Sequence, residues 1–166
     1  MRKTLILPIR RRREEKTNYR RRLALLKSKK PRVVARVTNA NVSLQLVDYN
    51  GSDKTKFAYI SKKLEEAGWK HSKNSIPACY LSGLSFGLLC KKNGVSEVVF
   101  DMGLARNTPG NRYLAVLKGI VDSGLQINFS EDKFPAQDRI LGKHISPEIE
   151  KSFSQAKQKI LGNYGK

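Results

Sequence analysis

Residues 32–48 read RVVARVTNANVSLQLVD and hold two apolar segments that alternate around a short polar turn. In each segment an apolar side chain recurs at every second position, which is typical of a strand with one buried face. These positions are Val33, Ala35, Val37, Val42, Leu44 and Leu46. Asn39-Ala40-Asn41 separates the segments, and asparagine tolerates the left-handed conformations that tight turns need. The pattern predicts a β-hairpin over Arg32–Thr38 and Val42–Asp48.

A third strand is expected directly after this hairpin. Asn50-Gly51 is a turn signal and leads into a segment near Lys56–Ser61 that suits a strand. Three consecutive strands joined by short turns form an antiparallel meander. We expect one face of this meander to be apolar and the other to be mixed and partly basic.

An uncharged run of seventeen residues, Asn74–Cys90, comes next. It is shorter than the ~20 apolar residues of a membrane-spanning helix, and it includes several polar residues. Gly83 and Gly87 have the spacing of close helix contacts in membranes, but they serve equally well where a soluble helix packs on a sheet. With Ser75 as N-cap and Asn93-Gly94 at its end, the run predicts a buried central helix.

The segment after this helix predicts one more strand and one more helix. Glu97–Asp101 is a short apolar run without alternation, which is typical of a strand covered on both faces and paired in parallel with an earlier strand. Thr108 is the expected N-cap of the helix, Pro109 its first residue, and Gly124 its end. An apolar stripe at helical spacing lies between them: Tyr113, Val116, Leu117, Ile120 and Val121.

The order of these elements predicts an α/β fold in which helices pack on a mixed sheet, with the meander followed by helix, strand and helix. We expect a core domain over residues 31–125, a basic N-terminal segment over 1–30 and a C-terminal extension over 126–166. Ser146-Pro147 starts a last helix in the extension. The narrow apolar stripe of that helix is Ile149, Phe153 and Ala156.

The basic segment has a charge density that an ordinary protein surface does not need. Residues 1–30 hold thirteen Lys and Arg against two acids, which gives a net charge of +11 out of +19 for the whole chain. Such charge repels itself unless a polyanion neutralises it, and guanidinium groups match phosphate oxygens bidentately. A nucleic acid is therefore the first partner to consider. The expected phosphate contacts are Arg10, Arg11, Arg12, Arg13, Arg20, Arg21, Arg22, Lys27, Lys29 and Lys30.

Part of the basic segment also has a helical pattern. Tyr19, Leu23 and Leu26 recur at i, i+4 and i+7, which predicts a short helix near Thr17–Lys27. We expect this apolar stripe to dock on the domain or on RNA, with a disordered tail as the alternative.

A basic membrane-surface protein is a rival interpretation, but it requires an amphipathic or lipidated anchor. Zinc is not expected, because Cys79, Cys90, His71 and His144 are too scattered for a four-ligand site. The two cysteines predict buried, reduced thiols in a cytoplasmic protein.

The loop Asp101–Arg112 is a second candidate phosphate site, because it runs from a strand end to a helix start. Arg106, Asn107 and Arg112 would supply the polar groups. The alternative is that Asp101 pairs with Arg106 or Arg112 to brace the loop, and both can hold for different arginines. The chain has no Walker pattern and no G-x-G-x-x-G, so neither a nucleotide cofactor nor a small-molecule substrate is expected.

Catalysis is not expected either. A two-metal nuclease needs several carboxylates around the metal pair, whereas Asp101 stands largely isolated among the predicted core elements. A nuclease of the ribonuclease-H-like class remains the second hypothesis. His144 lies among Arg139 and Lys143, where a surface role and an RNA-facing role are both open.

Several motifs in register resemble the 5S-rRNA-binding protein family of the large ribosomal subunit, universal large-subunit protein eighteen, in its archaeal and eukaryotic branch. They are Asn18–Leu26, Arg32–Asn39, Gly68-Trp69-Lys70, Pro77–Leu84, Asp101–Leu104, Arg112–Gly119, Asp122–Leu125, Phe134-Pro135 and Arg139–Ile145. The likeness covers most of residues 10–150 and does not extend to the last sixteen residues.

The resemblance implies a ribonuclease-H-like motif without catalytic carboxylates, and a structural rather than an enzymatic role. It implies that the basic segment and the polar face of the meander grip 5S rRNA and help attach it to large-subunit rRNA at the central protuberance, among neighbouring ribosomal proteins. Carried over by position, it adds Tyr19, Arg32, Arg36, Asn39 and Asn41 as RNA contacts. The stretches Arg106–Arg112 and Arg139–His144 would make further contacts.

Overall fold

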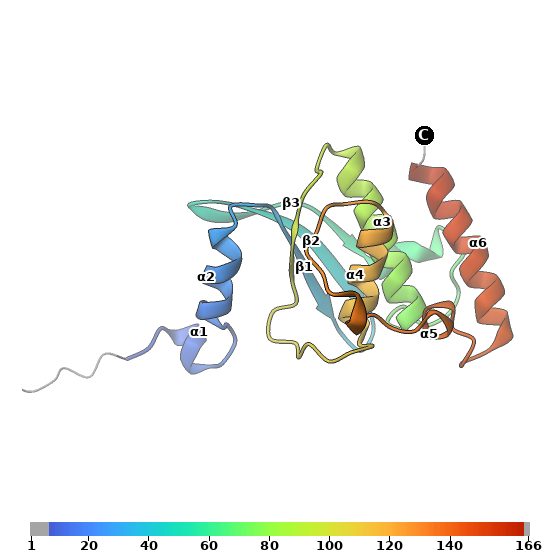
Figure 1. The fold of residues 1–166 in the computed structure, drawn as a ribbon, viewed down its shortest axis with the longest axis horizontal. Coiled ribbons are helices and arrows are strands. Elements are labelled where there is room, and N and C mark those ends of the chain that lie inside the picture. Colours follow the sequence, from blue (N-terminus) through green and yellow to red (C-terminus); the bar gives the residue numbers. More distant parts are fainter. Residues whose placement is uncertain (1–6, 165–166) are drawn as a thin grey trace, which may run out of the picture.

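The computed structural model describes residues 7–164, and its framework is a four-stranded mixed sheet with helices on both sides (Figure 1). The first six residues of the basic segment and the last two of the C-terminal extension lie outside the described part. The strands are β1 (Arg32–Val37), β2 (Val42–Asn50), β3 (Ser52–Ile60) and β4 (Val99–Asp101).

The sheet has the order β3-β2-β1-β4, in which β1 pairs antiparallel with β2 and parallel with β4. The predicted hairpin, meander and parallel pairing are confirmed. Two details differ from expectation. The third strand starts at Ser52, because the turn at Asn50-Gly51 needs no further residues. β4 is a half-buried edge strand rather than one covered on both faces, because no strand of the described chain continues the sheet beyond it.

The meander contains one irregularity. Leu46 pairs with Phe57, but the next residue, Val47, pairs with Thr55, so Lys56 has no partner across the ladder. Such a bulge bends a strand and increases its twist. The part of the β2–β3 hairpin between this bulge and its turn therefore bends away from the rest of the sheet. Figure 1 shows this part projecting beyond β1.

The helices form two unequal groups around this sheet (Figure 1). One side is covered by α3 (Ile76–Lys92) and α4 (Arg112–Asp122), and α6 (Pro147–Tyr164) packs behind α3. The short elements η1 (Ser61–Glu65), η2 (Glu131–Lys133) and α5 (Gln137–Leu141) connect them. The two N-terminal helices, α1 (Arg10–Arg13) and α2 (Tyr19–Lys27), lie on the other side.

The hydrophobic core lies between the sheet and α3. Val33, Ala35 and Leu44 on the strands are fully buried, and so is Phe86 of α3. The alternation of the first two strands is therefore confirmed. The C-terminal extension contributes to this same core, because buried side chains of α5 and α6 belong to one cluster with the strands: Ile140, Ile149, Phe153, Ala156 and Ile160.

Two predicted helix starts need correction. Ser75 occupies the N-cap position of α3, but its hydroxyl donates to the carbonyl of Ser72 and caps nothing in the helix. The next helix begins at Arg112, four residues after Thr108. Asn111 is its N-cap, since the Asn111 Oδ1 accepts from the N–H of Leu114 at 2.8 Å. Asparagine is among the strongest capping residues, so it overrides the Thr-Pro signal.

The glycines of α3 face a helix rather than the sheet, which differs from our expectation. A Cβ on Gly83 would lie 2.2 Å from the carbonyl oxygen of Val116, and one on Gly119 would lie 2.2 Å from that of Tyr80. The backbones of α3 and α4 therefore touch at these points. The Tyr80 hydroxyl donates to Asp122 at 2.7 Å across the same interface, and burial together with that carboxylate raises the pKa of Tyr80.

The described chain also agrees with the other expectations for the central helix. Between residues 7 and 164 no helix combines the length and apolarity needed to cross a bilayer. Cys79 and Cys90 are free and buried, and burial raises the pKa of both thiols to about 12. Thiols with such a pKa are inert at neutral pH.

The helix contact gives a first prediction. Changing Gly83 to Ala should lower the free energy of unfolding by about 1–3 kcal/mol, because the new methyl group overlaps a backbone carbonyl that cannot move aside. Gly162→Ala in α6 is the matched control, since a Cβ there meets nothing within 4 Å. It should stabilise by at most about 1 kcal/mol. Urea unfolding followed by circular dichroism measures both, and equal effects would contradict the close contact.

Candidate RNA-binding site

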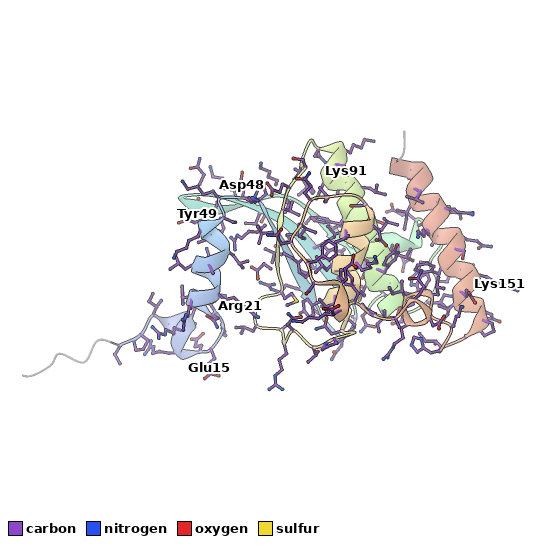
Figure 2. All side chains as sticks on the ribbon, in the orientation of Figure 1. Glu15, Arg21, Asp48, Tyr49, Lys91 and Lys151 are labelled. Carbon is purple, nitrogen blue, oxygen red and sulfur yellow. The ribbon has the colours of Figure 1, made fainter. Side chains whose placement is uncertain are left out.

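The basic arm, defined here as residues 7–30, is built from two short helices. All four residues of α1 are arginines, and all are exposed. Asn18 starts α2, because its Oδ1 accepts from the N–H of Arg21 at 3.0 Å. The predicted helix is therefore confirmed, with its first turn at Tyr19. Figure 2 shows the side chains of Glu15 and Arg21 on this arm, well apart from the layers that form the core.

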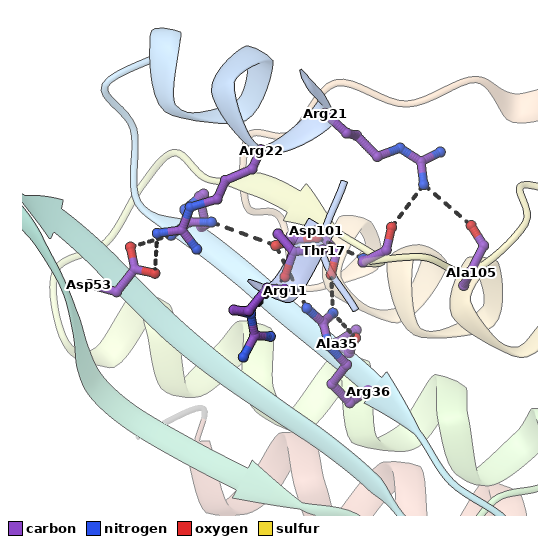
Figure 3. Close-up of polar contacts among 11 residues, drawn as sticks. Arg11, Thr17, Arg21, Arg22, Ala35, Arg36, Asp53, Asp101 and Ala105 are labelled. Atoms are coloured by element: carbon purple, nitrogen blue, oxygen red, sulfur yellow. Dashed lines mark hydrogen bonds and ion pairs between the residues drawn. The ribbon is translucent and has the colours of Figure 1, made fainter. Parts of the chain in front are cut away.

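The polar contacts of the arm with the domain are made by arginines. Of the predicted apolar stripe, Leu23 is 57% exposed, whereas Tyr19 and Leu26 are half-buried. Arg22 pairs with Asp53 of β3 at 2.6 Å, and Arg21 donates to the carbonyl of Gly103 at 2.8 Å. These partners are a carboxylate and backbone carbonyls, which accept hydrogen bonds from cationic donors (Figure 3).

Arg32 forms the centre of this contact. Its side chain is only 4% exposed and lies between two carboxylates, Asp53 at 2.7 Å and Asp101 at 3.6 Å. Arg22 approaches the other oxygen of Asp53, so one carboxylate links α2, β1 and β3. We had expected Arg32 to contact RNA. Its burial and its two acidic partners give it an intramolecular role instead.

The bracing role expected for Asp101 exists, but its partners are different. Asp101 pairs with Arg32 and, at 3.9 Å, with Arg36, and not with Arg106 or Arg112. The reason is the parallel pairing of β1 and β4, which places Asp101 opposite Val34, between the two arginines on β1. Asp101 Oδ1 also accepts from the N–H of Gly103 at 2.7 Å and fixes the start of the loop.

These contacts bear on the nuclease hypothesis. Asp53 and Asp101 lie on the same face of the sheet, but the guanidinium of Arg32 lies between them. Two-metal hydrolysis needs carboxylates that are open to the metal ions. Within residues 7–164 no three His, Cys, Asp or Glu side chains are grouped so that they could hold a metal ion.

Five cations of the arm are exposed and make no hydrogen bond or ion pair through their side chains among the described residues. They are Arg12, Arg13, Arg20, Lys27 and Lys29. Others are partly compensated. Arg10 and Lys16 both pair with Glu14. These two contacts, of which that of Lys16 has the larger effect, hold the pKa of the Glu14 carboxyl below its usual range. Lys30 pairs with Glu97.

A second group lies at the carboxyl edge, which we define as the turn 38–41 and the loop 102–111. Since β1 and β4 are parallel, the segments that follow them meet at the same end of the sheet. Asn39, Arg106 and Asn107 are exposed there, while Asn41 and Arg112 are half-buried. Figure 1 shows α1 and the loop after β4 along one border of the molecule.

The expected anion site at the start of α4 is less open than the sequence indicated. Asn111 caps the helix itself and also donates to the carbonyl of Arg106 at 2.9 Å. The backbone N–H of Gly110 donates to the carbonyl of Lys133 at 3.0 Å. Two of the backbone amides of this segment are thus already engaged, and the side chains of Arg106 and Arg112 are further groups available to a phosphate.

A third group lies within and directly after α5, near the same border of the molecule (Figure 1). Arg139, Lys143 and His144 are all exposed. Lys143 lies 3.1 Å from Asp138 and 3.9 Å from Glu150, and these carboxylates raise its pKa. The structure therefore brings the three groups to one side of the protein but leaves Lys143 partly neutralised.

Sequence reasoning missed the residue on which the arm depends. Asp53 is a single acid between a turn and a strand, and nothing in its neighbourhood distinguishes it from a solvated surface carboxylate. Only the fold places it beside Arg22 and Arg32. The position of Arg32 offered one weak signal, since it lies on a strand directly before a buried valine.

The basic arm is fixed on an α/β domain, and exposed cations lie along one border of the molecule. The acids Asp53 and Asp101 of the domain are engaged by arginine. These features are typical of a nucleic-acid-binding protein. Comparison with known proteins agrees. Residues 4–97 and 88–130 match the family of ribosomal large subunit proteins 60S L5 and 50S L18. The chain belongs to this family, whose members are structural constituents of the large ribosomal subunit and not enzymes.

Several archaeal proteins are similar to this chain. The large ribosomal subunit protein uL18 of Korarchaeum cryptofilum is 45% identical over 86% of this chain and 73% of its own length. That of Methanothrix thermoacetophila is 42% identical over 94% of this chain and 95% of its own. That of Natronomonas pharaonis is 44% identical over 84% and 77%. The resemblance stated from sequence motifs is therefore confirmed.

The arginine–aspartate contacts give a second prediction. Asp53→Ala should lower the free energy of unfolding by about 1–3 kcal/mol, because it removes a partner from the buried Arg32. Asp48→Ala is the control, since the pair of Asp48 with Lys56 is exposed to solvent and should contribute much less to stability. Chemical unfolding at pH 7 measures both. If the two substitutions cost the same, Asp53 does not anchor the arm.

Proposed function

We propose that this protein binds 5S rRNA and helps attach it to large-subunit rRNA at the central protuberance. The observation that carries the proposal is that some cations of the arm bind the domain while others stay exposed to solvent. Arg21 and Arg22 hold α2 on the domain, whereas Arg12, Arg13 and Arg20 are exposed and have no side-chain partner among the described residues.

The docked arm suits binding to a structured polyanion. A disordered basic tail would lose conformational freedom when it binds, and this loss weakens binding. Here the pair Arg22–Asp53 and the hydrogen bond of Arg21 already hold α2 on the domain, so this part of the arm has less freedom to lose. Arginine forks then meet phosphate oxygens bidentately.

The carboxyl edge supplies a second kind of contact. The side chains of Asn39 and Asn107 are exposed, and amide groups can donate to and accept from base edges and ribose 2′-hydroxyl groups. Arg106, Arg139 and His144 add positive or polar groups nearby. We infer that the arm neutralises the backbone while this edge recognises the shape of the RNA.

The remaining parts of the proposal concern architecture and location. We infer a non-catalytic ribonuclease-H-like motif, which the strand order β3-β2-β1-β4 with β4 parallel to β1 supports. The protein would act in the cytoplasm, with large-subunit rRNA and neighbouring ribosomal proteins as its other partners. It would use no cofactor, membrane or small-molecule substrate.

Salt dependence tests this function. If the protein contacts about ten phosphates, the slope of log K against log salt concentration should be near −9 for duplex RNA and near −7 for single strands. The triple substitution Arg12→Ala, Arg13→Ala, Arg20→Ala should weaken binding to 5S rRNA and reduce the magnitude of the slope by about 2–3. The melting temperature should change little, because these side chains are exposed and unpaired.

A matched variant separates local contacts from total charge. Lys63, Lys70 and Lys151 are exposed and unpaired among the described residues, and Lys151 lies at the end of the molecule opposite the arm (Figure 2). Replacing these three by Ala also removes three positive charges, but it should leave the slope nearly unchanged. Equal losses in both variants, or a slope between zero and about −2 for the unmodified protein, would refute the proposed function.

A further inference from the structure

A pocket of about 380 Å³ opens between the basic arm and the domain. Its walls come from α1, α2 and the residues between them, from β1, from the end of β4 with the loop after it, and from the start of α4. This volume falls in the range of about 300–1,000 Å³ that is usual for small-molecule sites. The contacts of Arg21 and Arg22 hold α2 on the domain beside this pocket (Figure 3).

The pocket is strongly electropositive. Six cationic side chains line it: Arg11, Lys16, Arg21, Arg22, Arg32 and Arg36. Asp101 is the only acid in the lining, and Asp53 and Glu14 neutralise cations from outside it. Six positive groups thus face three carboxylates, and about half of the charge has no counterpart within the described residues.

Several hydrogen-bond donors of these cations are unused. The Nε of Arg32 is buried and meets no acceptor, and it is the single buried side-chain nitrogen or oxygen in that state among the described residues. Arg11 donates only through its Nε, to Thr17 at 2.9 Å, so its two terminal nitrogens are free of protein partners. The exposed terminal nitrogens of Arg11 suit the oxygens of a phosphate group, whereas the Arg32 Nε is too buried to reach one.

The same pocket has an apolar part. Leu25, Met102 and Tyr113 contribute to its lining. The ring of Tyr113 is fixed, since its hydroxyl accepts from the backbone N–H of Val37 at 3.3 Å. A fixed aromatic ring next to guanidinium groups is the combination on which unpaired bases stack.

The loop is shaped to close this site. Gly103 has a φ of +63°, and a Cβ there would lie 2.9 Å from the guanidinium carbon of Arg36. Glycine therefore lets the loop fold over Arg36, and it brings the neighbouring Met102 to the pocket. A larger residue there would strain the backbone and displace the guanidinium of Arg36.

We propose that this pocket binds one unstacked nucleotide of the RNA, with its phosphate on the cations and its base against Tyr113 and Met102. The proposal rests on the proposed function, because it takes 5S rRNA as the source of the nucleotide. A lone inorganic ion would satisfy the charge, but it would leave most of the volume and the apolar wall unused. Phosphate and base together match both parts of the lining.

The chain offers a simple probe of this site. It contains two methionines, Met1 and Met102, and Met102 lines the pocket. In protein labelled with ¹³C at the methionine methyl groups, NMR gives one signal inside the site and one reference signal from the N-terminus. Met102→Leu assigns the two signals.

Addition of 5S rRNA should shift the Met102 signal through the ring current of a stacked base. Adenosine monophosphate should shift the same signal at much higher concentration, while inorganic phosphate should shift it far less. A shift with adenosine monophosphate but none with bound 5S rRNA would overturn the proposal in favour of a free nucleotide. No shift with either, or an equal shift with inorganic phosphate, would also overturn it.

Binding measurements provide a second test of the pocket. Tyr113→Leu keeps an apolar side chain but removes the ring, and it should weaken 5S rRNA binding about tenfold, as expected for the loss of one stacked base. Tyr113→Phe keeps the ring and should bind within about twofold of the unmodified protein. Melting temperatures of both variants show whether the fold is intact.

The two proposals fail in different ways. If 5S rRNA binds but Met102 does not respond and Tyr113→Leu binds normally, the pocket proposal is wrong and the function stands. If 5S rRNA does not bind at low salt, the proposed function is wrong, and the titration with adenosine monophosphate still decides whether the pocket takes a nucleotide.

Discussion

The burial of Arg32 between Asp53 and Asp101 is the constraint on which the functional surface depends. A guanidinium that is only 4% exposed needs partners on more than one side, and these come from β3 and β4 at the two edges of the sheet. Asp53 then has one oxygen left for Arg22, which holds α2 in place. The position of the arm and the pocket beneath it both follow from this arrangement.

This arrangement also explains why similar residues have different roles. Arg20, Arg21 and Arg22 are consecutive, but successive helical residues point about 100° apart, so they cannot share one partner. Two of them turn toward the carbonyls and the carboxylate of the domain, and Arg20 turns to solvent. The arm therefore holds its own position and still presents unneutralised charge to a polyanion. The same pairing explains why two acids on one sheet face do not form a metal centre.

The rest of the molecule supports this face from behind. The close contact of α3 with α4 through Gly83 and Gly119 makes a thin, rigid layer under the sheet. The C-terminal helix α6 then covers α3 with its own apolar stripe and joins the same core. Because the helices occupy one side of the meander, its other side is free for the arm.

The sequence by itself determined the meander, the buried central helix, the last helix and the basic character of the arm, because these depend on local periodicity and composition. It also identified the family through motifs in register. Only the tertiary structure decided which cations are free. Arg32 and Arg13 are the same residue type in basic surroundings, but one is buried between carboxylates and the other is exposed. The partners of Arg32 are 21 and 69 residues away in the chain. No local pattern encodes a charge pairing over such distances, since it arises only when the strands come together.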